Sequence, residues 1–382
     1  MWNLSIYCAK GVGPVTIQGQ CAKKEVGGIL NPHHPKWKKV ILKVKPFLEE
    51  NVMRLLCSTN YGSNLKVADL GCSSGPNALM VMFDIFTIIN NTKLSLNRDT
   101  PVDVLQIYLN DLFQNDFNNI FKLLPDFYQR IRETRDKVGA CFVNATPGNF
   151  YGRLFPNNYI HFFHSSCCLH WLSQVPEKLT KGAVKPLNKG NICLTATSLP
   201  AVYEAYFEQF QRDFKLFLKS RSDELTPGGS MVLTFIGREK DHKINYPWLM
   251  IGTVLKDMVL EGLVEEAKLD AFNLPIYGPT TEEVRQIIES ETSFTLQTLK
   301  SFKMGWGGNL QEDIGDFVLD SKMKVELIAK HLRAGFEPLL TAEFGKDIMD
   351  ELFSRFEKKL SQLKELDTLQ YTILVMSMTK AS

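Results

Sequence analysis

The sequence predicts an α/β protein in which an open sheet is followed by a largely helical second part. Short apolar runs suited to strands alternate with segments of helical period up to about residue 240, and helical patterns dominate afterwards. With 382 residues, the chain can bury one large core or two modest ones. We divide it into an N-terminal segment (1–37), an α/β core (38–240), a largely helical cap with one core strand at about 294–304 (241–366) and a C-terminal core strand (367–382).

A glycine turn joins the first predicted strand to the helix after it. The apolar run 66–70 contains Asp69 near its end, breaks at Gly71 and Gly75, and gives way to an apolar segment, 78–89, long enough for a helix. The spacing D-x-G-x-x-x-G differs from the G-x-G-x-x-G of dinucleotide sites and matches the looser turn with which α/β folds hold S-adenosylmethionine. Taken alone, this spacing fits an ordinary buried turn equally well.

Further elements follow in order along the chain. The helix predicted at 38–56 contains Pro46, which predicts a kink or restart, and residues 226–229 predict a turn. The other predicted strands are 104–109, 140–145, 160–164, 230–237, 294–304 and 370–379. The other stretches of helical pattern are 201–220, 247–270, 281–289 and 321–366.

Polar and aromatic residues follow several of these strands, at the edge where open α/β sheets bind ligands. Asp111 ends the second strand and has two open interpretations, a ribose acceptor or the N-cap of a helix at 113–124. The turn at 146–156 is rich in glycine, proline and aromatic residues, and it can lay a ring against an adenine. His170 and Trp171 follow the fourth strand and can reach whatever lies opposite the cofactor.

Composition limits the partners that we expect. A formal net charge of +2 gives no reason to propose nucleic acid or an anionic membrane, and no stretch is apolar enough to span a membrane. The first thirty residues do not read as a signal peptide. The eight cysteines lack C-x-x-C spacing, which favours reduced thiols in a cytoplasmic protein.

Several longer segments carry a specific resemblance. The chain resembles the SABATH family of plant S-adenosylmethionine-dependent methyltransferases, which act on small carboxylic acids or on xanthine nitrogens. The resemblance implies a Rossmann-like methyltransferase sheet with a helical cap, a small-molecule acceptor held between sheet edge and cap, and a homodimer. The matching segments are VADLGCSSGPN, LNDLFQNDFNNIFKLLP, TPGNFYGRLFP, HSSCCLHWLSQVP, PLNKGNI, PGGSMVLTFIGR, EGLVEEAKLDAFNLPIYGPTTEEV and FEPLLTAEFG.

The resemblance also implies roles for individual residues. The positions that match the family's cofactor site are Cys72, Asn77, Asp111, Leu112, Asn149 and Phe150. We add Asp69 and Gly71, because they belong to the glycine turn that is expected to hold the cofactor. The matching substrate positions are Cys167, His170, Trp171 and Tyr371. A cation site known in family members matches Asn188, Asp270, Phe272 and Asn273, and its oxygen-rich set would suit Mg²⁺ in a structural role.

The chain departs from the family pattern at two places. The family's N-terminal S-Y-A-x-N-S pattern, which closes over cofactor and substrate, has no counterpart in residues 1–37. Cys167 stands where many members have tyrosine, which removes a hydroxyl from the acceptor pocket.

The segment LFQNDFNNIFKLLP, the Leu-His-Trp triplet and Tyr371 resemble the caffeine-pathway N-methyltransferases and favour a xanthine acceptor, as in the conversion of 7-methylxanthine to theobromine in caffeine biosynthesis. His170 is then the expected catalytic residue, which orients the purine, assists loss of its proton, or both, while Trp171 stacks on the ring. One alternative is a carboxyl O-methyltransferase that makes methyl esters of jasmonate, salicylate or benzoate. Another is a non-catalytic homologue that binds the cofactor only.

Overall fold

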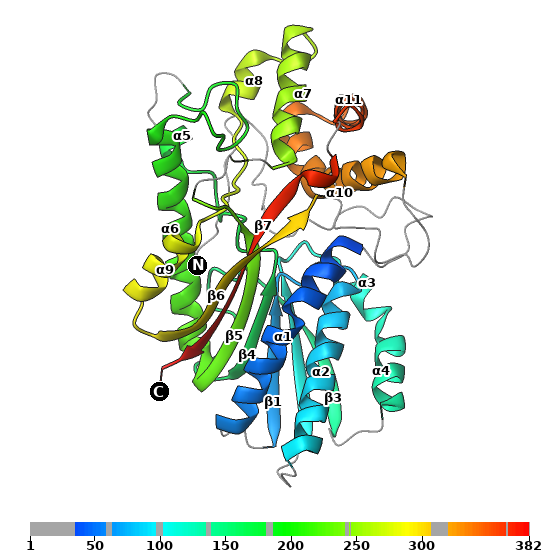
Figure 1. The fold of residues 1–382 in the computed structure, drawn as a ribbon, viewed down its shortest axis with the longest axis vertical. Helices are drawn as coiled ribbons and strands as arrows, with labels where there is room; N and C mark the ends of the chain where they lie inside the picture. The colour runs from blue at the N-terminus through cyan, green and yellow to red at the C-terminus, as the bar shows by residue number, and fades with distance from the viewer. Residues whose placement is uncertain are drawn as a thin grey trace.

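The computed structural model describes residues 35–58, 63–96, 102–134, 139–180, 186–240, 244, 246–306, 320–363 and 366–381. The expectations about the N-terminal segment, up to residue 34, lie outside the described residues. Within them the chain forms one seven-stranded sheet flanked by helices, so the predicted α/β fold class is confirmed (Figure 1).

The sheet has the strand order β3-β2-β1-β4-β5-β7-β6. The first five strands are parallel, and β7 runs antiparallel to both of its neighbours. Because β1 lies between β2 and β4, the strand order reverses beside β1, and the crevice at the carboxyl ends of such strands is where open α/β sheets bind ligands. The strands are β1 (Asn64–Leu70), β2 (Val104–Asp111), β3 (Ala140–Pro147), β4 (Ile160–Ser166), β5 (Leu225–Gly237), β6 (Phe294–Gly305) and β7 (Gln370–Lys380).

Two apolar cores cover the two faces of the sheet. On one face pack α1 (Pro35–Ser58), α2 (Asn77–Leu96) and α4 (Leu124–Glu133), the blue and cyan helices in front of the strands in Figure 1. On the other pack α6 (Pro200–Glu224) and α9 (Thr281–Ser290). The short α3 (Phe117–Phe121) follows β2, and α5 (Glu177–Thr180) packs against α6. The aromatic residues of α6 that the helical period predicts as core, such as Phe210 and Phe214, are indeed buried.

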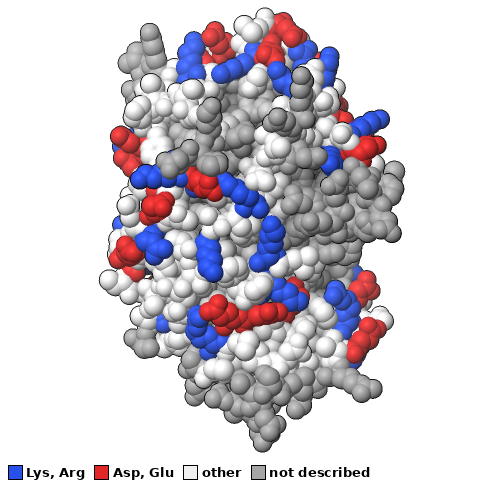
Figure 2. Space-filling model, viewed as in Figure 1, with Lys and Arg blue, Asp and Glu red and all other residues white. Residues whose placement is uncertain are grey.

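Four helices, which we refer to as the cap, gather beyond one end of the sheet in Figure 1: α7 (Trp248–Leu260), α8 (Glu266–Ala271), α10 (Ser321–Phe344) and α11 (Met349–Ser361). A short 3₁₀ turn, η3 (Leu366–Thr368), leads from the cap into β7. The ring of Trp171, just after β4, lies 5.4 Å from that of Phe336 on α10, so the cap faces the carboxyl ends of the parallel strands. In the described part of the chain no helix is long and apolar enough to cross a membrane. Lys and Arg side chains lie among Asp and Glu side chains on the face shown in Figure 2.

The structure corrects one of the two interpretations of Asp111. No helix spans 113–124; α3 begins at Phe117, and its N-cap is Asp116, whose side chain accepts a hydrogen bond from Asn118 N. A new helix, α4, then starts at Leu124 with proline in its first turn, where the missing N–H is tolerated. Asp111 is therefore the last residue of β2 and caps no helix.

The ends of several elements differ from those that the sequence predicts, and glycine residues account for two of the differences. The helical stretches 247–270 and 321–366 each contain two helices, with Gly262 (φ 75°) and Gly345 (φ 86°) at the breaks, a backbone conformation that glycine adopts without steric cost. The predicted turn at 226–229 lies inside β5, at an irregularity of register opposite β4. Helix α1 continues through Pro46.

Candidate cofactor and acceptor site

The glycine turn after β1 is held against the end of β2. The backbone N–H groups of Gly71 and Cys72 both donate to Asn110 O at 2.9 Å. Gly71 has a φ of 77°, and a Cβ there would lie 2.4 Å from the Cys168 sulfur. A Cβ on Gly75 would meet nothing within 4 Å. Gly71 is thus required by its backbone conformation and by its close approach to the loop after β4.

Asp111 lies at the centre of this edge. Its Oδ2 accepts from Ser73 N and its Oδ1 from Leu112 N, both at 2.8 Å. Burial raises its pKa to about 6, although these two N–H groups act in the opposite direction, and the nearby Asp69 charge adds to the rise. Since each carboxylate oxygen has a further lone pair, the ionised group can still accept two adjacent hydroxyls.

Two amide side chains add further acceptors to the turn. Asn110 Nδ2 donates to Thr146 O (2.7 Å) and Gly148 O (2.9 Å), which ties the end of β2 to the turn after β3. Asn115 Nδ2 donates to Ser73 O at 3.0 Å. The Oδ1 atoms of both asparagines are buried and accept no hydrogen bond from the described residues. A buried acceptor left without a donor is costly, so this edge fits a ligand that carries donors, such as a ribose and an amino group.

Asp69, predicted to face the cofactor, is engaged by the protein itself. Its Oδ1 lies 2.7 Å from His164 Nδ1, and both side chains are buried. Burial raises the pKa of the Cys72 thiol, and the carboxylates of Asp111 and Asp69 raise it further, so the thiol stays neutral. Asn77 begins α2 and is half-buried.

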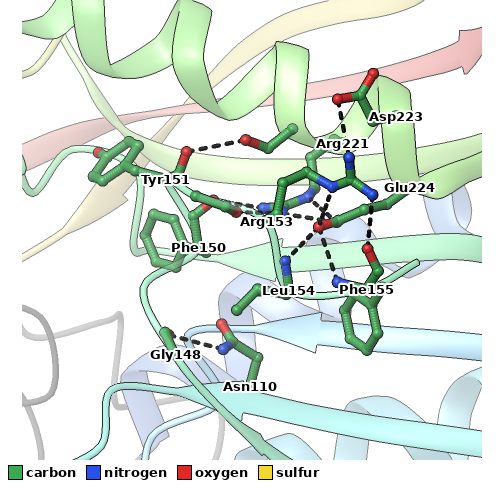
Figure 3. Close-up of polar contacts among 12 residues, drawn as sticks. Asn110, Gly148, Phe150, Tyr151, Arg153, Leu154, Phe155, Arg221, Asp223 and Glu224 are labelled. Carbon is green, nitrogen blue, oxygen red and sulfur yellow. Dashed lines mark hydrogen bonds and ion pairs between the residues drawn. The ribbon is translucent and has the colours of Figure 1, made fainter. Parts of the chain in front are cut away.

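The segment 148–155, which we call the cofactor loop, follows β3 (Figure 3). Phe150 is buried and packs edge-on against Phe217 of α6, with ring centroids 5.9 Å apart. Asn149 Oδ1 accepts from Tyr151 N at 2.9 Å, which shapes the loop. The Tyr151 hydroxyl donates to Trp171 O at 2.7 Å, so the cofactor loop is joined directly to the segment that carries the predicted acceptor residues.

His170 is buried and has a defined ring orientation. Ile236 N donates to His170 Nδ1 at 3.4 Å, and Tyr277 N donates to the His170 carbonyl oxygen at 2.9 Å. Because a neutral imidazole accepts at one nitrogen and donates at the other, acceptance at Nδ1 assigns the ring proton to Nε2.

Beside His170 stands an aromatic group that we call the acceptor wall, defined as Trp171, Phe336, Trp248 and Tyr371. Neighbouring rings in it have centroids 5.4 Å, 5.8 Å and 6.3 Å apart, in that order. Burial raises the pKa of the Tyr371 hydroxyl, so it stays protonated. Cys167 is half-buried, with a φ of 58°, and its thiol interacts electrostatically with Tyr371. The structure therefore brings the four sequence-predicted substrate positions to one region between β4, β7 and the cap.

At the predicted cation site, the residues contact one another and Lys189, and Asn188 Oδ1 is buried and accepts no hydrogen bond from the described residues. Asn188 Nδ2 donates to Asn273 Oδ1 at 2.8 Å, while the Asp270 carboxylate accepts from Gly190 N at 2.9 Å and pairs with Lys189 Nζ at 3.3 Å. Asp270 is the only carboxylate of the set, and its lysine partner is 62% exposed and also pairs with Glu266 at 3.0 Å. The side chain of Phe272 packs on Phe344. Among the described residues, no three His, Cys, Asp or Glu side chains gather as metal ligands. We assign no step to a cation.

Sequence reasoning missed several residues that shape this site. Only the fold reveals the role of Ser73, Asn115, Tyr151, His164, Phe336 and Trp248, because their partners are distant in the chain. Arg221 did carry a signal, because it continues the buried stripe Phe210, Phe214, Phe217 at helical spacing, where a charged residue is unusual.

Together, the fold and the site define an α/β protein with buried hydrogen-bond acceptors at the carboxyl edge of its sheet, beside a group of packed aromatic rings. A family model described as "SAM dependent carboxyl methyltransferase" matches residues 35–381. A solved structure of a loganic acid methyltransferase with SAH superimposes with a TM-score of 0.76 at 30% identity, over 93% of this chain and 98% of that one.

Proteins of similar sequence are also named as methyltransferases or as a caffeine synthase. A probable jasmonic acid carboxyl methyltransferase 2 of Theobroma cacao is 41% identical, covering 90% of this chain and 92% of its own. The jasmonate O-methyltransferase of Arabidopsis thaliana is 41% identical, covering 87% and 91%. A probable caffeine synthase of Coffea canephora is 42% identical, covering 89% and 91%. The chain belongs to this family of S-adenosylmethionine-dependent methyltransferases, the SABATH family.

Proposed function

We propose that the chain transfers the methyl group of S-adenosylmethionine to a small carboxylic acid and forms a methyl ester. The observation that carries the proposal is the match of residues 35–381 to the carboxyl methyltransferase family model, supported by the jasmonate relatives at 41% identity. The hydrogen bond from Ile236 N to His170 Nδ1 is consistent with it. It makes His170 a donor at Nε2, able to orient an acceptor oxygen but not to remove a proton at that nitrogen. A carboxylic acid needs no such removal, since near neutral pH it is already an ionised nucleophile.

The bound cofactor supplies an electrophilic methyl group on its sulfonium. The protein's share is to hold nucleophile, methyl and sulfur in line, and such alignment can supply about 7–11 kcal/mol. Asp111 would accept the ribose hydroxyls, and Phe150 would lie against the adenine. His170 and Trp171 would hold the carboxylate at the end of β4, and the rest of the acceptor wall would enclose its apolar part.

A second candidate is N-methylation of a xanthine, which the sequence pattern favoured. The acceptor wall supports it, because an aromatic face can stack on a flat, neutral purine ring. The relative named as a probable caffeine synthase supports it as well. The carboxylic acid is favoured over it because the family model and the jasmonate relatives are named for carboxyl methylation.

The test is transfer of labelled methyl from S-adenosylmethionine to jasmonate, salicylate, benzoate, xanthosine, 7-methylxanthine and theobromine, with cofactor binding followed in parallel. Label in a base-labile ester is the expected result. Label in a purine would move the protein to the second candidate. Cofactor binding with no transfer to any acceptor would leave the non-catalytic alternative.

The role of His170 has its own test. We expect His170→Ala to lower kcat/KM for the acceptor by about 10- to 100-fold, the value of a lost hydrogen bond to a charged group, with S-adenosylhomocysteine binding unchanged. His170→Gln keeps a side-chain N–H donor and should retain part of the activity. The homodimer, the cytoplasmic location and the division into core and cap remain predictions.

A further inference from the structure

A fully buried ion pair lies behind the cofactor loop, in the last turn of α6. Arg221 and Glu224 both have side chains that are 0% exposed, and Arg221 Nη2 lies 2.7 Å from Glu224 Oε2. Arg221 Nε also donates to the same carboxylate oxygen, at 2.8 Å. The guanidinium carbon lies 5.1 Å and 5.2 Å from the ring centroids of Phe163 and Phe217. Removing two charges from water is expensive, so such a pair is weak evidence for a stabilising role by itself.

The remaining hydrogen bonds of the pair go to the backbone of the cofactor loop (Figure 3). Arg221 Nη1 donates to Phe150 O at 2.5 Å, and Nη2 donates to Gly152 O at 2.8 Å. Glu224 Oε1 accepts from Leu154 N at 2.5 Å and from Phe155 N at 3.0 Å. Four backbone groups of a single irregular loop are thus satisfied by two side chains of one helix turn.

Neighbouring contacts reinforce this attachment unequally. Ser220 Oγ donates to Tyr151 O at 3.1 Å in a buried position. Arg153 Nη1 pairs with Asp223 Oδ2 at 3.2 Å, but these side chains are 41% and 46% exposed, and exposed pairs contribute little. The buried pair is therefore the part of the attachment that defines the loop backbone.

We propose that Arg221 and Glu224 are positioning residues that set cofactor affinity by holding the backbone of the cofactor loop, Arg221 at Phe150 and Gly152 and Glu224 at the two residues that follow Arg153. The inference rests on the proposed cofactor role of Asn149 and Phe150. An irregular loop pays conformational entropy when a ligand orders it, and a loop held in advance pays less. The rigid fork of arginine is required, because one ammonium cannot reach two carbonyls and a carboxylate in fixed directions.

The loop is also joined to the groups that would hold the ribose. Gly148 N donates to Asp111 O at 2.8 Å, and Gly148 O accepts from Asn110 Nδ2 at 2.9 Å. One end of the loop is thus tied to β2 and the other to α6. Releasing the α6 end should displace the Phe150 ring relative to the Asp111 carboxylate, and should disturb the acceptor region less, through the Tyr151 hydroxyl alone.

The experiment compares three proteins with wild type by calorimetric binding of S-adenosylhomocysteine, by steady-state kinetics and by thermal unfolding. Arg221→Lys keeps the charge and loses the fork. The double variant Arg221→Met with Glu224→Gln removes both charges, and replacing a buried ion pair by neutral groups is often tolerated. The control is Lys178→Met on α5. It removes an exposed ion pair to Glu208 of α6, the helix that also carries Arg221 (Lys178 Nζ to Glu208 Oε1, 2.6 Å).

We expect both Arg221 variants to raise the dissociation constant of S-adenosylhomocysteine about tenfold, with a smaller rise in the acceptor KM that is transmitted through the Tyr151 hydroxyl. The double variant should regain most of the unfolding temperature that Arg221→Lys loses, without regaining affinity. In a Phe150→Ala background, Arg221→Lys should weaken binding no further, because it acts through that residue. The control should match wild type.

Three results would overturn the inference: wild-type affinity in both Arg221 variants, affinity that returns together with stability in the double variant, or additive losses with Phe150→Ala. Failure of the wild-type protein to bind S-adenosylhomocysteine would count against the cofactor assignment itself. The two failures are therefore distinguishable.

Discussion

Cofactor binding should weaken about tenfold between pH 7 and pH 5 through Asp111. Its buried carboxyl has a pKa of about 6, and only the ionised form offers acceptors to both ribose hydroxyls. The fraction ionised is about nine-tenths at pH 7 and about one-tenth at pH 5, so the apparent dissociation constant rises about tenfold. The α-carboxyl group of S-adenosylhomocysteine titrates well below this window and its α-amino group well above it, so their charges change little between pH 5 and pH 7.

The stability of the free protein should move the other way. Burial raises the Asp111 pKa from 3.8 to about 6, so its protonated form is favoured in the folded state. That contribution is fully present below pH 3.8 and is lost as the pH rises through 6, a change of about 3 kcal/mol. Asp213, also buried, has its pKa raised by burial to about 6 and changes stability in the same direction. Weaker binding at pH 5 would therefore not reflect acid unfolding through these groups.

The assay is isothermal titration calorimetry with S-adenosylhomocysteine from pH 7 to pH 5 on wild type, Asp111→Asn and Asp213→Asn. Wild type and Asp213→Asn should show the tenfold change. Asp111→Asn should bind weakly at both pH values, with a flat profile. A flat profile in wild type, or a tenfold change that persists in Asp111→Asn, would refute the assignment of Asp111 to the ribose.

Three further predictions follow from the site. Tyr151→Phe removes the hydrogen bond to Trp171 O, and we expect it to raise the acceptor KM several-fold at unchanged cofactor affinity; equal losses for both ligands would contradict this. Gly71→Ala should lower the unfolding free energy by about 2–4 kcal/mol, because its Cβ would strike the Cys168 sulfur at a positive φ, whereas Gly75→Ala should change it by under about 1 kcal/mol in the same denaturation assay. Treatment with EDTA followed by desalting should leave methyl transfer unchanged. Activity that is lost on this treatment and restored only by added Mg²⁺ would contradict this prediction and support the cation site.

The local chemistry of the chain was enough to predict most of the architecture. Apolar runs of strand length that alternate with helical periods predicted all seven strands of the described sheet, because the spacing of apolar residues in each element reflects which of its faces is buried. The segment from Asp69 to Gly75 predicted a strand, a turn and a helix for the same reason. The positions at the strand ends, such as Asp111, His170 and Trp171, could be proposed as site residues because parallel strands end at one edge.

Only the tertiary structure decided which of these groups face one another. Asp69 and His164, and Arg221 and the carbonyl of Phe150, are far apart in the chain and meet through strand register and helix packing. The place of β7 between β5 and β6, and the hydrogen bond that assigns the proton of His170 to Nε2, depend on the same long-range pairing. The local sequence pattern predicts whether a residue is buried, but the residue that it contacts depends on how distant segments of the chain align.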